Sequence, residues 1–364
     1  MNERLQRMQE LGQAPWVDEL SREDIKNGDL ERMIEDGIVG MTSNPAIFQK
    51  AIANSDLYDE QLRELSQRED DPKEIFWEVA RVDIQDACDI FMPVYERTSG
   101  EDGFISLEVQ PDIAYDQRAT IEEAARLHQM IERPNLFVKI PATLQGLVAI
   151  EEMISRGKSI NVTLIFSLER YREVARAYIR GIKRLVEGGG DPSGVRSVAS
   201  FFVSRIDTEA DGRLEELGAD DLKDKLAVAN AKLAYRVYKQ VFGGARWRSL
   251  EEKGANRQRL LWASTSTKDP DLPDTIYVEG LVGPETVNTM PKQTIEAVKD
   301  HAEIRPTLEE GVEEAVELLG RLREAGMDYE DVTDTLEQQG IEKFAEPFDE
   351  MLEEIENKGR QLVS

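Results

Sequence analysis

The sequence of 364 residues contains one cysteine, two histidines and no long uninterrupted apolar run. A single cysteine excludes an intrachain disulfide framework, and with two histidines it leaves too few soft ligands for a structural zinc site. Because a membrane-spanning helix takes about 20 consecutive apolar residues, none is expected. The N-terminal stretch MNERLQRMQELGQ is charged and polar, unlike the apolar core of a signal peptide. These absences predict a cytoplasmic protein that holds no metal.

Positive charge is also scarce, because 45 Lys and Arg stand against 73 Asp and Glu and give a net charge of −28. Such a field repels the phosphates of nucleic acids and the surface of anionic lipids. Neither nucleic acid nor membrane is therefore an expected partner.

A monomer and a homodimer are both compatible with the sequence.

Short apolar or β-branched runs alternate with longer stretches of helical spacing along the chain. Eight of these runs have the composition of β-strands. They are PWVDE (15–19), GIVGMTSN (37–44), FISLEVQPD (104–112), LFVKIPAT (136–143), SINVTLIFS (159–167), VASFFVSRID (198–207), LLWASTST (260–267) and TIYVEGLV (275–282). Helical spacing is clearest at 120–132, 147–157 and 167–189.

Eight strands that alternate with helices predict a closed (β/α)8 TIM barrel in the α/β class. Residues 46–100 are predicted to form helices inserted after the second strand, and residues 292–361 helices that pack outside the barrel. We therefore expect a barrel with additional N- and C-terminal helices, and a single domain over residues 1–364. A doubly wound open sheet is the alternative, although no G-x-G-x-x-G motif follows the first strand.

Seven of the eight predicted strands carry polar residues in their middle or late positions, where the active site of such a barrel lies. These residues are Asp18, Asn44, Glu108, Lys139, Asn161, Thr163, Ser200, Arg205 and Ser264. Each alone has a structural explanation: Asn44 suits a helix cap before Pro45, and Thr163 is an ordinary strand residue. Their common position in the barrel favours a site.

Lys139 is the most informative of these residues, because it lies inside the apolar run NLFVKIP. A lysine in an apolar site loses hydration of its charged form, which makes more neutral amine available. A neutral amine attacks a carbonyl and forms a Schiff base, an electron sink for cleavage of a neighbouring C–C bond. On the strand pattern alone, a lysine that snorkels to solvent is an equally good interpretation.

Schiff-base chemistry also needs groups that move protons, and two carboxylates in different surroundings can divide that work. Asp18 and Glu108 are the acidic residues placed inside strand runs. Most of the other acidic residues lie in helical or loop patterns, where solvation explains them.

The strand motifs resemble those of the transaldolases of the pentose phosphate pathway. The resemblance runs from about Trp16 to Pro291 through WVDEL, MTSNPAIF, LEVQPD, VKIPAT, INVTLIFS, SFFVSRID and LWASTST, in the order of the family. It implies a cofactor-independent transferase that moves a dihydroxyacetone unit from sedoheptulose 7-phosphate or fructose 6-phosphate to an aldose phosphate.

The resemblance also implies roles for the catalytic residues. Lys139 in VKIPAT would form the Schiff base, and Asp18 in WVDEL would move the proton of the C4 hydroxyl during cleavage. Glu108 in LEVQPD would act through a water held with Thr163 during carbinolamine formation and dehydration.

The remaining family positions would bind the substrate. Asn44, Asn161 and Ser200 would hydrogen-bond the hydroxyls of the dihydroxyacetone unit, and Arg205 and Ser264 correspond to phosphate-binding positions. A chain this acidic needs such a local basic clamp, and the guanidinium of Arg205 offers two parallel donors.

Two points separate this chain from other members of the lineage. Many members carry a second phosphate-binding arginine after the AS motif, whereas WASTSTKDP offers Lys268, with Ser266, for that role. The nearest alternative function is a fructose-6-phosphate aldolase, which releases free dihydroxyacetone and tends to carry a tyrosine at the position of Phe202. A phenylalanine has no proton to donate, which favours transfer.

Overall fold

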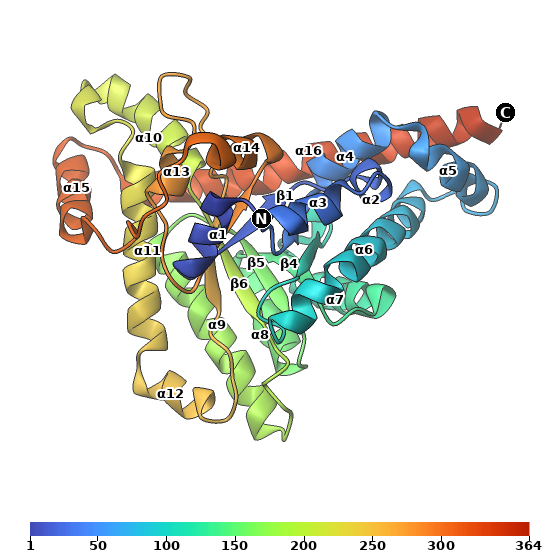
Figure 1. Ribbon diagram of the computed structural model, residues 1–364, viewed down its shortest axis with the longest axis horizontal. Coiled ribbons are helices and arrows are strands. Elements are labelled where there is room, and N and C mark those ends of the chain that lie inside the picture. The colour runs from blue at the N-terminus through green and yellow to red at the C-terminus, as the bar shows by residue number, and fades with distance from the viewer. Residues whose placement is uncertain (364) are drawn as a thin grey trace.

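The computed structural model describes residues 1–363, in which eight parallel strands close into a barrel with neighbours in sequence order (Figure 1). The pairing of the last strand with the first completes the ring. The strands are β1 Gln13–Asp18, β2 Met41–Thr42, β3 Ile105–Glu108, β4 Leu136–Pro141, β5 Ile160–Ile165, β6 Ser197–Phe202, β7 Arg259–Ala263 and β8 Thr286–Met290. The predicted barrel is confirmed, and the open sheet is excluded.

Two of the predicted strands need correction. Residues 275–282 are not the eighth strand: they contain the short helix α13, Ile276–Glu279, and the strand is TVNTM at Thr286–Met290. That strand was missed because its composition is polar: Thr286 and Asn288 are fully buried, but they are hydrogen-bonded to Gln13 and Thr265. The predicted run 198–207 also extends too far, because a helix begins at Ser204.

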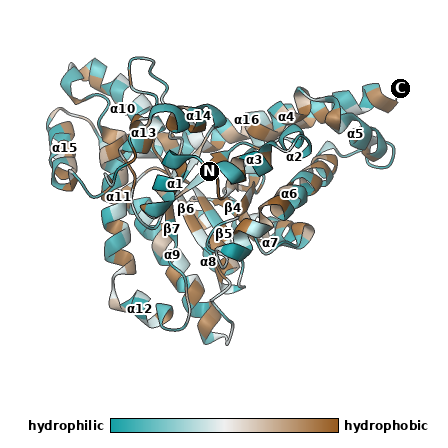
Figure 2. Cartoon of the chain, in the orientation of Figure 1, coloured by the Kyte–Doolittle hydropathy of each residue, from teal (hydrophilic) through white to brown (hydrophobic). Residues whose placement is uncertain are grey.

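Helices surround the barrel and alternate with the strands. In chain order they are α1 Glu3–Glu10, α2 Arg22–Lys26, α3 Asp29–Asp36, α4 Pro45–Ala53, η1 Asp56–Tyr58, α5 Asp59–Ser66, α6 Pro72–Arg97, η2 Pro111–Ile113, α7 Gln117–Ile131, α8 Leu144–Ser155, α9 Leu168–Glu187, α10 Ser204–Leu217, η3 Asp220–Leu222, α11 Leu226–Phe242, α12 Ala245–Glu251, α13, α14 Lys292–His301, α15 Val312–Glu324 and α16 Tyr329–Val363. Hydrophilic and hydrophobic residues alternate along α6, α9 and α11, as amphipathic helices require (Figure 2).

The predicted helices and their insertion after the second strand are present. The patterns at 120–132, 147–157 and 167–189 correspond to α7, α8 and α9. Ser167 caps α9 by accepting a hydrogen bond from the backbone N–H of Arg170, and Gly188 ends it. The insertion between β2 and β3 holds α4, η1, α5 and α6, and α4 brings one face to the carboxyl ends of the strands.

The C-terminal helix α16 packs outside the barrel as predicted, but the sequence did not show which part of the barrel it covers. It crosses the carboxyl ends of the strands and runs from α10 to α4 and α5 (Figure 1). A Cβ atom at Gly340 would stand 3.0 Å from Cδ2 of Leu164 at the end of β5, so glycine lets the helix lie close to the barrel. The sequence did not reveal this placement because an amphipathic pattern shows which face of a helix is buried, not what covers that face.

No helix within residues 1–363 is long and apolar enough to cross a membrane.

Candidate active site

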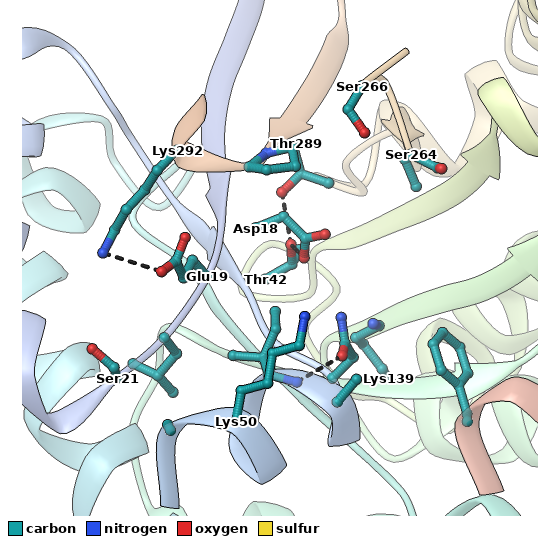
Figure 3. Close-up of a pocket in the computed structure, with 18 of the residues that line it drawn as sticks. Asp18, Glu19, Ser21, Thr42, Lys50, Lys139, Ser264, Ser266, Thr289 and Lys292 are labelled. Atoms are coloured by element: carbon teal, nitrogen blue, oxygen red, sulfur yellow. Dashed lines mark hydrogen bonds and ion pairs between the residues drawn. The ribbon is translucent and has the colours of Figure 1, made fainter. Parts of the chain in front are cut away.

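A cavity of about 660 Å³ opens at the carboxyl ends of the strands, between α4 and α16 (Figure 3). Ten of the twelve residues predicted for the site line it: Asp18, Asn44, Lys139, Thr163, Ser200, Phe202, Arg205, Ser264, Ser266 and Lys268. The other two, Glu108 and Asn161, lie directly behind lining residues. The strand ends therefore bring the predicted residues together.

Lys139 is buried, and its side chain is only 7% exposed. Its Nζ lies 2.8 Å from Oε2 of Glu108 and donates a hydrogen bond to the carbonyl oxygen of Ser43 at 3.1 Å. The backbone after it is fixed by a tight turn into α8, where a Cβ at Gly146 would collide with the carbonyl oxygen of Pro141. The lysine therefore does not snorkel to solvent, and its amine is held at the floor of the cavity.

Glu108 faces Lys139 because the two residues are aligned on neighbouring strands β3 and β4. Burial raises the pKa of Glu108, while the charge and hydrogen bond of Lys139 oppose that rise. A buried carboxyl whose pKa is raised exchanges a proton more readily near neutral pH than an exposed glutamate does. Its contact with an amine makes it suited to moving protons to and from groups attached to that nitrogen.

Asp18 ends β1 on the other side of the cavity. Its Oδ1 accepts a hydrogen bond from Oγ1 of Thr42 at 2.6 Å, and Thr42 is bonded in turn to Oγ1 of Thr289 at 2.6 Å (Figure 3). Burial raises the pKa of Asp18 against the opposing effects of Lys139, Thr42 and Arg205. Two carboxyl groups, the buried Glu108 and the half-buried Asp18, thus act electrostatically on one amine, but each has its own hydrogen-bond partners.

The residues of β5 and β6 form a hydrogen-bonded row beside Lys139. Oγ of Ser200 donates to Oδ1 of Asn161 at 2.7 Å, and Nδ2 of Asn161 donates to Oγ of Ser106 at 3.1 Å. Asn161 is fully buried and positions Ser200, which lines the cavity. Oγ1 of Thr163 is buried without a hydrogen-bond partner among the described residues, so it is available to a water or substrate oxygen.

The structural role considered for Asn44, a helix cap, is confirmed, and the residue also lies at the cavity. Its Oδ1 accepts a hydrogen bond from the backbone N–H of Ile47 at 3.1 Å and caps α4, and its side chain also lines the cavity. No residue within 1–363 accepts a hydrogen bond from the amide Nδ2 of Asn44, so the cap leaves a donor available at the cavity.

The cavity is basic although the protein is acidic. Six of its lining residues are Lys or Arg and four are Asp or Glu, whereas the whole chain has 45 of the former and 73 of the latter. Arg205, in the first turn of α10, pairs with no carboxylate of residues 1–363, and its guanidinium lies 5.2 Å from the ring centroid of Phe202. Ser264 follows β7 and lies next to Ser204, the residue before Arg205, with the two Oγ atoms 2.9 Å apart. An anion is the natural partner of this side of the cavity.

Several lining residues were missed by the sequence analysis. Thr42 and Thr289 support Asp18 and resemble ordinary strand residues. Lys50 extends from α4 into the cavity (Figure 3), and Lys343 and Phe344 reach it from α16. The helical residues were missed because no local pattern indicates that a helix faces a site. The one available signal is Gly340, a helix-weakening residue within a long helical pattern.

No group of three or more His, Cys, Asp and Glu side chains within residues 1–363 is placed to hold a metal ion.

A buried amine in contact with the carboxyl group of Glu108, in a cavity that also holds the carboxyl group of Asp18 at the carboxyl end of a (β/α)8 barrel, defines an enzyme site of the lysine-dependent aldolase type. The sequence profile of the transaldolase/fructose-6-phosphate aldolase family matches residues 15–355. The chain belongs to this family.

Curated relatives cover almost the whole chain. A transaldolase of Acidothermus cellulolyticus is 49% identical over 355 residues, which are 96% of this chain and 95% of that protein. Transaldolase 2 of Streptomyces coelicolor is 47% identical over 368 residues, covering 100% of this chain and 99% of its own length. A transaldolase of Thermobifida fusca is 46% identical over 360 residues, 98% of each chain.

Proposed function

We propose that this protein is a transaldolase that moves a dihydroxyacetone unit from a ketose phosphate to an aldose phosphate through a Schiff base on Lys139. The observation that carries the proposal is the buried amine of Lys139, 2.8 Å from Glu108, in a cavity that also holds Asp18. The names of the relatives support transfer, and sedoheptulose 7-phosphate and fructose 6-phosphate are the proposed donors. Cytoplasmic location, and action as a monomer or homodimer, belong to the same proposal.

The first stage joins Lys139 to the donor. The neutral amine attacks the C2 carbonyl, the carbinolamine forms, and loss of water leaves an imine. Glu108 gives and takes the protons of this stage, because it touches the reacting nitrogen and burial raises its pKa. The unpartnered hydroxyl of Thr163 supports a role in holding the water through which Glu108 acts.

The second stage breaks the bond between C3 and C4 of the donor. Asp18 takes the proton of the C4 hydroxyl, C4 becomes the carbonyl of the departing aldose phosphate, and the bonding electrons pass into the imine to give an enamine. In the reverse direction the enamine attacks an acceptor aldehyde, and Asp18 returns the proton to the new hydroxyl. Asn44 and Ser200 hold the hydroxyls of the three-carbon unit, and Asn161 keeps Ser200 in place.

The phosphate of donor and acceptor is assigned to Arg205 and Ser264, with Lys268 and Ser266 as further contacts. All four line one cavity, and no carboxylate pairs with Arg205 or Lys268 in the part of the chain that the structure describes. Lys268 thus offers a point charge in place of the family's second arginine.

Arg205→Gln should raise the KM for fructose 6-phosphate by roughly 10- to 100-fold, because charge-assisted hydrogen bonds contribute about 1.5–3 kcal/mol each. Lys268→Gln should raise it less, since an exposed ammonium gives weaker and undirected contacts. Steady-state kinetics measure both values. Unphosphorylated fructose is the control substrate. An equal rise in the KM for fructose would mean that these residues do not bind the phosphate.

Borohydride trapping tests the proposal itself. Reduction in the presence of fructose 6-phosphate should attach the three-carbon unit to Lys139, as located by peptide mass mapping. Erythrose 4-phosphate should then be required for turnover, because a transferase needs an acceptor. An adduct on another lysine, or none, would refute the Schiff-base assignment.

The family also contains fructose-6-phosphate aldolases, and the side chain of Phe202 argues against that activity here. It lines the cavity but carries no proton for the enamine. Turnover of fructose 6-phosphate to free dihydroxyacetone at equal rates with and without an acceptor would favour the aldolase.

A further inference from the structure

The aromatic ring of Phe344 lies between the two ends of the proposed substrate site. It comes from α16, and its centroid is 5.9 Å from Nζ of Lys139 and 5.9 Å from Cζ of Arg205. The residue lines the cavity and is 7% exposed. Within residues 1–363, no other aromatic ring is recorded within cation–π distance of both cations.

Contact with the barrel holds the helix that carries Phe344 close to the ends of the strands. Gly340, one turn earlier, rests on Leu164, which stands at the irregular end of β5 with φ of 60°. The register of β5 and β6 shifts at this same place, between Val162 and Ile165. A bulge of this kind redirects a side chain, and here it directs Leu164 to the helix. The position of the Phe344 ring is therefore set both by α16 and by the contact of that helix with the end of β5.

We propose that Phe344 is a positioning residue that covers the covalent intermediate and decides whether the three-carbon unit goes to an aldehyde or to water. This inference rests on the proposed transaldolase function. A substrate joined to Lys139 and held by Arg205 must pass along the ring, because the ring borders both groups. Phe344 and Phe202 then form an apolar wall on which water finds no hydrogen-bond partner.

The competing reaction is hydrolysis of the enamine. The enamine carbon takes a proton from water, a second water adds to the imine carbon, and the C–N bond breaks to return the amine of Lys139 and free dihydroxyacetone. Both steps need water at the face that Phe344 covers. Removal of the ring should therefore raise release relative to transfer, even where the acceptor is saturating.

The test compares Phe344→Ala and Phe344→Leu with wild type and with Met351→Ala. Met351 lies two turns further along α16, is fully buried and does not line the cavity, so its truncation weakens the same helix without uncovering the site. Dihydroxyacetone release and transfer to erythrose 4-phosphate are measured in one reaction, and their ratio is the readout.

We expect the ratio to rise roughly tenfold or more in Phe344→Ala, because admitted water competes with the acceptor, to rise less in Phe344→Leu, and to be unchanged in Met351→Ala. An unchanged ratio in both Phe344 variants, or an equal rise in Met351→Ala, would overturn the inference. Failure of the proposed function is distinguishable, since it would appear in wild type as absence of a borohydride adduct or of transfer.

Discussion

Lys139→Met should abolish transfer while leaving a folded protein. Methionine keeps the length and apolar stem of the side chain but has no amine to attack a carbonyl. We expect turnover to fall by roughly 10⁴-fold or more, the scale on which loss of a covalent nucleophile acts. Borohydride should trap no substrate on the variant. Coupled assays of aldose phosphate release and mass spectrometry of the reduced protein measure the two effects.

The stability of this variant is informative because Lys139 is also one partner of a buried ion pair. Removing one partner of such a pair typically lowers the free energy of unfolding by about 3–5 kcal/mol, since the other charge remains buried. Most of that loss is avoided if Glu108 takes up a proton and becomes neutral, which it does readily because burial already raises its pKa. We therefore expect a smaller loss, which grows as pH rises and the proton must be given up.

Lys158→Met is the matched control. It makes the same substitution at an exposed lysine before β5, at the opposite end of the barrel from the cavity. It should change neither turnover nor trapping. Full activity in Lys139→Met, or an adduct that survives the substitution, would show that the covalent intermediate forms elsewhere.

The sequence predicted which residues lie together at the strand ends, but it did not predict the eighth strand or the course of the C-terminal helix. Strand ends carry their polar residues at fixed places, so the closed barrel alone brings Asp18, Glu108 and Lys139 together. The eighth strand was missed because buried residues such as Thr286 and Asn288 are polar and hydrogen-bonded. Apolar composition marks a strand whose side chains pack in an apolar core, and it fails where the buried side chains are polar and hydrogen-bonded to one another.

The contribution of α16 could not be predicted for a different reason. Phe344 is distant in sequence from Lys139, and the geometry that joins them depends on where a long helix crosses the barrel. That crossing is decided by contacts such as Gly340 on Leu164, which no local spacing encodes. The ring that borders both ends of the proposed site is thus visible only in three dimensions.

Asp18→Asn should reduce the C–C bond cleavage step without preventing imine formation. Asparagine still accepts the hydrogen bond from Thr42 through its amide oxygen, so the local packing is retained. It takes no proton from the C4 hydroxyl, and loss of a positioned general base lowers kcat by about 10²- to 10⁴-fold. Single-turnover cleavage of fructose 6-phosphate measures the loss, and borohydride should still trap the six-carbon adduct on Lys139.

The pH profile separates a proton-transfer role of Asp18 from a structural one. Cleavage needs the ionised carboxylate, so activity should fall as pH drops through the pKa of Asp18, which burial places above the ordinary range of an aspartate. Burial also raises the pKa of Glu108, so wild type should show two acidic limbs and the variant only one. Glu19→Gln is the control, because Glu19 is the next residue, lines the cavity and pairs with Lys292 at 3.2 Å. If Asp18→Asn kept both limbs, or if Glu19→Gln removed one, the base for cleavage would have to be another group.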